Sequence, residues 1–224
     1  MKSFLLGLGL LASVGMVQAA PQLASHPAAG NTYIPAPPPP AGLLPIFDNI
    51  ARKYPKGFYN TIAGRPIVGP NSTVGLPETW MAAPFTPATN MTLKRVQVGI
   101  SWGGVGTNAA VVAIYDDSAG LPGNALTTWH ATGMSGYGSC CSLVVKNTAG
   151  LPLTGGQQYW LAIKTDNSSK DAYIVWNYNT ADQVTLQNVA IYCKDSSGHT
   201  CSGPSGEWLA TPLLPTVAYA VYGN

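Results

Sequence analysis

Apolar and polar residues alternate along much of the chain after about residue 64. The clearest case is the segment 96–102, where valine, isoleucine and tryptophan alternate with glutamine, glycine and serine. Because successive side chains of a β-strand point to opposite faces, this pattern predicts a strand with one buried face. Similar short runs, also predicted as strands, occupy residues 109–115, 125–132, 141–147, 158–164, 171–178, 183–192 and 214–222.

Turn-forming residues separate these runs and indicate the fold class. The segment 116–123, with the sequence Asp-Asp-Ser-Ala-Gly-Leu-Pro-Gly, is the clearest turn. Many short strands with turns at intervals of about 8–12 residues are typical of an all-β fold, and we expect an antiparallel, jelly-roll-like β-sandwich. No helical pattern alternates with the strands, which argues against a parallel α/β sheet.

A helical pattern occurs once, before the predicted strands. Apolar residues recur at helical spacing from Ile46 to Tyr54, and Pro55 and Gly57 follow directly. This spacing, ended by residues that break helices, predicts one short N-terminal helix. We expect the helix to dock on an edge of the sandwich.

The first 45 residues have the composition of an export signal followed by a spacer. Lys2, the apolar stretch 4–17 and the small residues at 17–19 are typical of a cleavable signal peptide. The proline-rich run 35–40 favours an extended polyproline II conformation. The predicted organisation is a signal peptide at 1–19, a proline-rich spacer at 20–45, a short helix and edge segment at 46–77, and a β-sandwich domain at 78–224.

Composition and charge narrow the class of partner. Only 9% of the 224 residues are charged and the formal net charge is +2, so the chain has no electrostatic footprint for nucleic acid. No segment after the leader has the roughly 20 apolar residues that span a bilayer. We therefore expect a secreted or extracytoplasmic protein that binds no nucleic acid and has no membrane span.

The four cysteines predict disulfide bonds. An even number of cysteines in an oxidising compartment favours bridges, and the adjacent pair Cys140 and Cys141 lacks the spacing of a zinc knuckle. Cys193 and Cys201 bracket a short polar loop whose closure costs little entropy, so we expect these two to pair. Cys140 then pairs with Cys141, and the alternative connects each of them to Cys193 or Cys201.

Candidate catalytic residues are few. Residues 99–103 match the Gly-x-Ser-x-Gly nucleophile pattern, but Ser101 lies in an alternating strand rather than at a strand-to-helix elbow. Residues 206–209, Gly-Glu-Trp-Leu, resemble the strand that carries the catalytic glutamate of secreted glutamic peptidases, where a glutamine helps the glutamate to activate water. Glu207 is therefore the candidate catalytic residue. The interpretation that we favour is an edge-strand glutamate beside a packed tryptophan.

We expect no cofactor, and calcium is the metal for which the chain offers candidate ligands. Asp116 and Asp117 lie in the predicted turn, and calcium takes several oxygen ligands from loops. Aspartates in such a sequence also cap turns by hydrogen bonds to the backbone, which is the role that we favour for them.

Aromatic residues give the positive indication of ligand binding. The chain contains 6 Trp and 11 Tyr. In the predicted strand 171–178, Trp176 and Tyr178 share one face and Tyr173 lies on the other. Since exposed aromatic rings stack on sugars, Trp176 and Tyr178 are the candidate ligand-binding residues, with a polysaccharide or glycan as partner. The alternative is that all of these rings pack in the core.

Two segments resemble exported bacterial jelly-roll domains of the "choice-of-anchor" type. They are residues 113–123, Ala-Ile-Tyr-Asp-Asp-Ser-Ala-Gly-Leu-Pro-Gly, and 153–161, Leu-Thr-Gly-Gly-Gln-Gln-Tyr-Trp-Leu. The similarity covers about residues 78–222 and implies a β-sandwich at the cell exterior without a known catalytic residue. We expect a non-catalytic secreted protein that binds extracellular carbohydrate or another surface ligand. The alternatives are a secreted hydrolase of glutamic-peptidase type and a purely structural envelope protein.

Overall fold

The computed structural model describes residues 38–50, 59–139, 143–179, 186–196 and 198–224. Within these ranges the chain forms β-strands and no helix. The strands are β1 (Leu44–Asp48), β2 (Gly64–Val68), β3 (Glu78–Phe85), β4 (Met91–Val98), β5 (Ile100–Trp102), β6 (Ala109–Ser118), β7 (Leu121–Thr132), β8 (Val144–Leu153), β9 (Tyr159–Lys164), β10 (Tyr173–Asn177), β11 (Leu186–Lys194), β12 (Glu207–Pro215) and β13 (Tyr219–Gly223). None of the described segments is a helix that could cross a bilayer.

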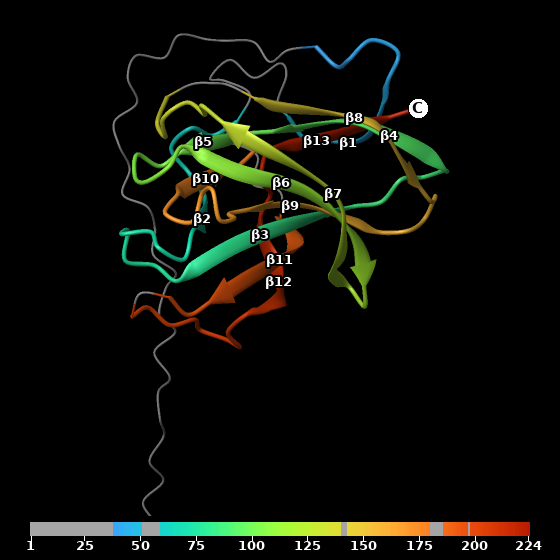
Figure 1. Cartoon of the computed structure of the whole chain (residues 1–224). Helices are drawn as coiled ribbons and strands as arrows, with labels where there is room; N and C mark the ends of the chain where they lie inside the picture. The colour runs from blue at the N-terminus through green and yellow to red at the C-terminus, as the bar shows by residue number, and fades with distance from the viewer. Residues whose placement is uncertain (1–37, 51–58, 140–142, 180–185, 197) are drawn as a thin grey trace, which may run out of the picture.

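The strands form two sheets, which lie as separate layers in Figure 1. The small sheet has the order β1-β13-β4-β8, and the large sheet has the order β5-β10-β2-β3-β9-β6-β7. The hairpin β11–β12 is attached to the large sheet through pairing of β11 with β3. All strand ladders are antiparallel, so the predicted all-β, antiparallel class is confirmed.

One hydrophobic core lies between the two sheets. The small sheet contributes Val96 and Val221, and the large sheet contributes Met81, Leu161 and Ile163, all at most 1% exposed. Burial of each such side chain stabilises the fold by about 1.5–3 kcal/mol. Within β3 and β9 these residues occupy every second position, so the alternation in the sequence marks the face that meets the opposite sheet.

The alternating segment 96–102 is not one strand but two, because the chain changes sheets at Gly99. Val98 pairs with Tyr219 in the small sheet, and Ile100 pairs with Trp176 in the large sheet. A Cβ at Gly99 would lie 2.9 Å from the Cβ of Ala218. Only a glycine therefore lets the backbone cross between the sheets at this close approach.

The N-terminal part of the fold differs from the prediction. Ile46 and Phe47, which we expected to open a helix, lie in β1, while residues 51–54 of the expected helix lie outside the described residues. The ring of Phe47 stacks on Tyr219 of β13, with centroids 4.3 Å apart. The short spacing of these apolar residues is compatible with a helix or with a strand. Pairing with β13, which is distant in the sequence, makes the segment a strand. β1 and β2 thus join the sheets although they precede the predicted boundary at residue 78.

Two buried tyrosines differ in whether their hydroxyl groups form a hydrogen bond. The hydroxyl of Tyr219 donates a 2.6 Å hydrogen bond to the backbone oxygen of Pro84, which connects the two sheets. The hydroxyl of Tyr173 is buried without a hydrogen-bond partner in the described part of the chain. Burial, and then the nearby phenol of Tyr137, raises the pKa of Tyr173 from 10.0 to about 12.

These surroundings predict opposite effects for two matched substitutions. At neutral pH, Tyr219→Phe should lower the free energy of unfolding by about 1 kcal/mol because it leaves a buried carbonyl unpaired, whereas Tyr173→Phe should be neutral or stabilising. Above pH 10 the unfolded Tyr173 releases its proton while the folded one keeps it, so the wild type loses stability as the pH rises toward 12. Urea denaturation at pH 8 and 11 tests this, and an equal alkaline loss in Tyr173→Phe would contradict it.

Candidate functional site

Trp176, the predicted sugar-binding residue, lies in the core. Its exposed fraction is 0%, and its indole N–H donates a 3.1 Å hydrogen bond to the backbone oxygen of Ala218. Its ring packs edge-on against Tyr219, with centroids 6.0 Å apart. A ring without an exposed face cannot stack on a sugar, so the assignment of Trp176 to a ligand site is wrong. Tyr178 is half-buried against the same core.

The structure does not complete a catalytic site at Glu207. This residue is exposed at the start of β12, an edge strand that pairs only with β11 among the described strands, and it lies opposite Cys193. Gln187, the glutamine of this hairpin, pairs with Leu214 at its other end, about 20 Å away at the usual rise of a strand. Glu207 thus has the position of an edge-strand glutamate. The other candidate, Ser101, is fully buried.

The two candidate calcium ligands cap the turn between β6 and β7. Oδ1 of Asp117 accepts hydrogen bonds of 2.8 Å from Trp160 Nε1 and from Gln158 Nε2, and Asp116 accepts from the backbone and side-chain amides of Asn124. Burial alone would raise the pKa of Asp117. The hydrogen bonds that Asp117 accepts from Trp160, from the Gly120 backbone and from Gln158 lower this pKa below its ordinary value. The described residues contain no group of three metal-binding side chains.

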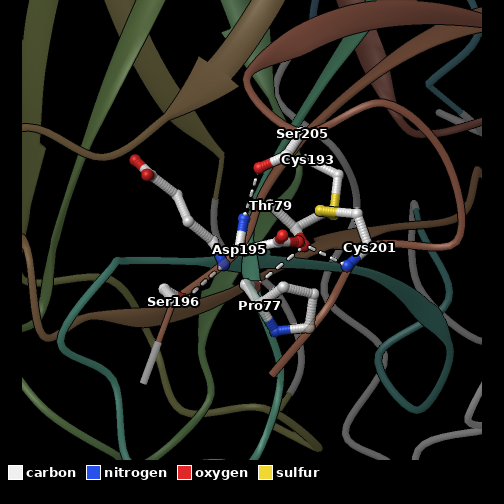
Figure 2. The surroundings of a disulfide bond; sticks show 8 residues. Pro77, Thr79, Cys193, Asp195, Ser196, Cys201 and Ser205 are labelled. Atoms are coloured by element: carbon white, nitrogen blue, oxygen red, sulfur yellow. Dashed lines mark hydrogen bonds between the residues drawn. A yellow bond between two sulfur atoms is a disulfide. The ribbon is translucent and has the colours of Figure 1, made fainter. Parts of the chain in front are cut away.

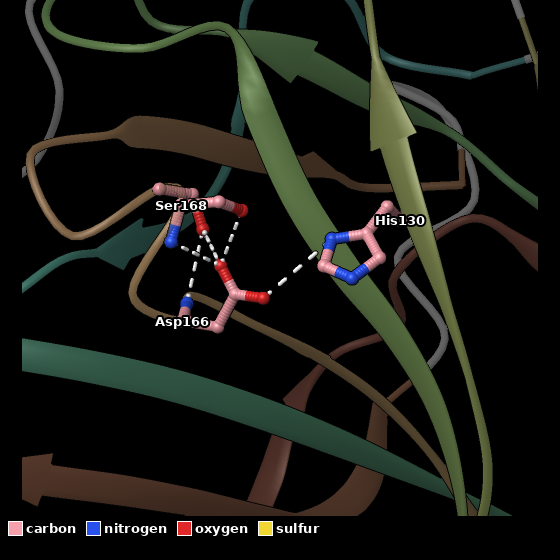
Figure 3. Close-up of polar contacts among 4 residues, drawn as sticks. His130, Asp166 and Ser168 are labelled. Carbon is pink, nitrogen blue, oxygen red and sulfur yellow. Dashed lines mark hydrogen bonds and ion pairs between the residues drawn. The ribbon is translucent and has the colours of Figure 1, made fainter.

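His130 and Asp166 form a surface ion pair rather than a catalytic dyad. His130 Nδ1 lies 3.5 Å from Asp166 Oδ2, a contact that is an ion pair only when the histidine is protonated, and the histidine side chain is 65% exposed. Figure 3 shows that the serine beside this pair faces the carboxylate, and Ser168 Oγ donates to Asp166 Oδ1 at 2.7 Å. A nucleophilic serine needs a hydrogen bond to its base, which this arrangement does not provide.

A row of alanines crosses the outer face of the large sheet, which is the face turned away from the small sheet. Each alanine pairs with the next across neighbouring strands, in the order Ala113 of β6, Ala162 of β9, Ala82 of β3, Ala190 of β11 and Ala210 of β12. The first four are fully buried in a hydrophobic cluster with Tyr115 and Trp160, against which Trp208 packs. Their methyl groups are small enough for large rings to lie over the sheet.

An aromatic side chain lies two positions from each of these alanines and therefore on the same face. These five residues, here termed the outer aromatic cluster, are Trp80 of β3, Tyr115 of β6, Trp160 of β9, Tyr192 of β11 and Trp208 of β12. Tyr115 and Trp160 are buried, whereas Trp80, Tyr192 and Trp208 are half-buried and present ring surface to solvent.

The rings of the outer aromatic cluster contact one another across the alanine row. Trp80 and Tyr192 are stacked, with centroids 4.1 Å apart. Trp208 meets Tyr192 edge-on at 5.8 Å and Tyr115 at 6.2 Å. Tyr115 and Trp208 lie on strands separated by β9, β3 and β11, and residues of β12 also approach β7, so the large sheet curls and brings the two rings together. The result is a preformed aromatic surface.

Lys164 places a positive charge at this surface. Its Nζ lies 5.4 Å from the ring centroid of Trp80 and 5.7 Å from that of Tyr115, within the range of a cation–π contact. The indole N–H of Trp80 donates to Thr165 Oγ1 at 3.1 Å, which holds the ring in place. The rings and the ammonium group are therefore positioned together before any ligand binds.

The disulfide bond between Cys193 and Cys201 holds the hairpin that carries two of these rings. The pairing confirms the prediction from the polar loop, while Cys140 and Cys141 lie outside the described residues. Figure 2 shows Asp195 inside the loop, where its Oδ1 accepts a 2.7 Å hydrogen bond from the Cys201 backbone. Tyr192 immediately precedes Cys193, so the bridge fixes β11 next to the outer aromatic cluster.

One carboxyl group lies on the same face beyond Trp80. Glu78 is 7% exposed and pairs in register with Lys194 of β11. Burial raises the pKa of Glu78, and the charge of Lys194 opposes this effect only in part. The backbone N–H of Glu78 donates to Ser196 Oγ at 2.8 Å, which joins the disulfide loop to β3.

The sequence contains a signal for this site that strand-by-strand analysis missed. Each of the five strands carries an aromatic residue and an alanine two positions apart, as in Trp80-Met81-Ala82 and Trp208-Leu209-Ala210. Such a pair places a large and a small side chain on one face. Its repetition indicates a surface built for rings, but only the strand order brings the five pairs side by side.

Comparisons of the chain with protein-family models, with curated proteins and with solved structures found no match. The resemblance to choice-of-anchor domains therefore stays a prediction.

Proposed function

We propose that the protein is an exported, non-catalytic β-sandwich that binds extracellular carbohydrate through the outer aromatic cluster. The observation that carries the proposal is the group of three half-buried rings, Trp80, Tyr192 and Trp208, which contact one another on the outer face of the large sheet. Aromatic rings with an apolar face and a polar edge bind ligands that combine both characters, as sugar rings do. The surface is also preorganised, which lowers the entropic cost of binding.

Export and the choice-of-anchor type of jelly roll belong to this proposal. The two antiparallel sheets with one shared core are compatible with a jelly-roll sandwich. The Cys193–Cys201 bridge is compatible with an oxidising compartment, because disulfides are rare where cellular reductants act. The signal peptide on which the export prediction depends lies outside the described residues.

The proposal predicts that Trp208→Ala weakens polysaccharide binding by about tenfold, which corresponds to the loss of one aromatic contact of about 1.4 kcal/mol. Affinity electrophoresis in gels that contain xylan, hydroxyethyl cellulose or polygalacturonate measures the effect. Trp208→Phe, which keeps an aromatic ring, should retain most of the binding.

Trp102→Ala is the matched control for this experiment. Trp102 is also half-buried and lies on the edge strand β5 at the other end of the large sheet, remote in strand order from the outer aromatic cluster. We expect it to bind as the wild type does. If no polysaccharide retards the wild type, or if both tryptophan variants lose binding equally, the proposed function is wrong and a structural role gains support.

A further inference from the structure

We infer that the carbohydrate recognised by the outer aromatic cluster is acidic, a uronic-acid-containing polysaccharide whose carboxylate meets Lys164. The inference rests on the proposed function and specifies its substrate class. Its basis is the position of the Lys164 ammonium group, which lies over the rings of Trp80 and Tyr115 instead of extending away from the surface.

The register of the strands places Lys164 in line with the exposed rings. Ile163 pairs with Met81, so Lys164 lies beside Trp80, and Trp80 pairs with Tyr192, which pairs with Trp208. The four outward side chains therefore form one line across β9, β3, β11 and β12. A sugar chain that stacks on the rings at one end of this line has a cation at the other end.

Lys164 lacks a carboxylate partner within the described part of the chain. The ion pair described there joins His130 to Asp166, and no carboxylate lies at ion-pair distance from Lys164. Glu78, the buried carboxyl group on this face, pairs in register with Lys194 instead. The Lys164 ammonium group, which contacts two ring faces, can still bind an anion, since a cation–π contact replaces only part of its hydration.

A hexuronate unit combines the two features that the surface recognises. Its pyranose ring offers C–H groups to an aromatic face, and its carboxylate offers two oxygens to an ammonium group. A neutral hexose satisfies the rings alone. A sulfated glycan would also offer an anion, but with a different geometry and a larger group, so the two anionic classes have to be separated by experiment.

The test compares polygalacturonate with its fully methyl-esterified form, which has the same backbone and no charge, and dextran with dextran sulfate. The full chain should bind polygalacturonate about tenfold more tightly than the methyl ester at low salt, and the preference should shrink as salt screens the contact. Lys164→Met should remove the preference and leave binding of the methyl ester unchanged. The control is Lys146→Met, at a half-buried lysine of the small sheet. It changes the net charge by the same amount and should keep the preference for polygalacturonate.

The possible outcomes separate this inference from the proposed function. Equal binding of polygalacturonate and its ester, reduced equally by Trp208→Ala, would overturn the inference and leave the proposed function standing. A loss of preference in Lys146→Met as large as in Lys164→Met would overturn it as well, because net charge would then be the cause. Binding of dextran sulfate without binding of polygalacturonate would overturn the assignment to uronic acids. Binding of no polysaccharide would overturn both.

Discussion

Trp176→Ala should lower the free energy of unfolding by about 3–5 kcal/mol, the usual cost of truncating a fully buried large aromatic residue. The indole is 0% exposed and contacts Tyr219 of the opposite sheet, so its removal leaves a cavity between the two layers. The substitution also leaves the Ala218 backbone oxygen without the 3.1 Å hydrogen bond from the indole N–H. Urea denaturation followed by circular dichroism measures the loss as a shift of the midpoint.

Trp208→Ala is the informative comparison for this variant. Trp208 is half-buried on the edge strand β12, so its truncation removes less contact area and should cost less stability than that of Trp176. The two tryptophans should therefore separate folding from binding. If the Trp176→Ala protein melted as the wild type does but no longer bound polysaccharide, the burial of Trp176 in the core would be contradicted.

The double variant Cys193→Ser/Cys201→Ser should lose about 2–3 kcal/mol, as expected for a bridge that closes a short loop. The separation of the two cysteines is 8 residues, which places the whole constraint on the end of the β11–β12 hairpin. Because β12 pairs only with β11 among the described strands, we expect the hairpin to open locally before the rest of the protein unfolds.

Hydrogen exchange of the backbone amides tests where the stability is lost. Amides of β12 should exchange faster in the double variant, whereas those of β6 and β9, which lie inside the large sheet, should keep their protection. Polysaccharide binding should weaken in parallel, since Tyr192 and Trp208 both depend on the hairpin. Unchanged exchange in β12 would mean that side-chain packing alone holds this hairpin, and equal acceleration in all strands would mean that the bridge acts globally.

Short apolar or alternating runs between turn residues were sufficient to predict several strands of the large sheet. The expected segments 109–115, 125–132 and 158–164 correspond to β6, β7 and β9. β6 and β9 are buried along nearly their whole length and read as short apolar runs bounded by turn residues, whereas β7 has one face that is more exposed. The same rule failed for Ile46 and Phe47, whose short apolar spacing suits a helix equally well. Pairing of β1 with β13, at the other end of the chain, decided that case.

The candidate binding residues show a second limit. The pattern placed Trp176 and Tyr178 on one side and Tyr173 on the other, and they do pack into different clusters although Tyr178 follows the end of β10. It could not say which face the small sheet covers. That choice depends on where β4 and β13 lie in space, and it buried Trp176 completely. The outer aromatic cluster likewise depends on the register between β3, β11 and β12.

The sequence by itself determined the local features of this protein: strands from two-residue periodicity, turns from Asp and Gly, and the Cys193–Cys201 bridge from a short polar loop. Each of these depends on residues that are neighbours in the chain. The tertiary structure decided the crossing at Gly99, the face that is buried and the rings that meet at the surface. Those features depend on pairings between segments distant in sequence, such as β3 with β9 and β3 with β11, and the free energy of these pairings comes from contacts that no local pattern contains.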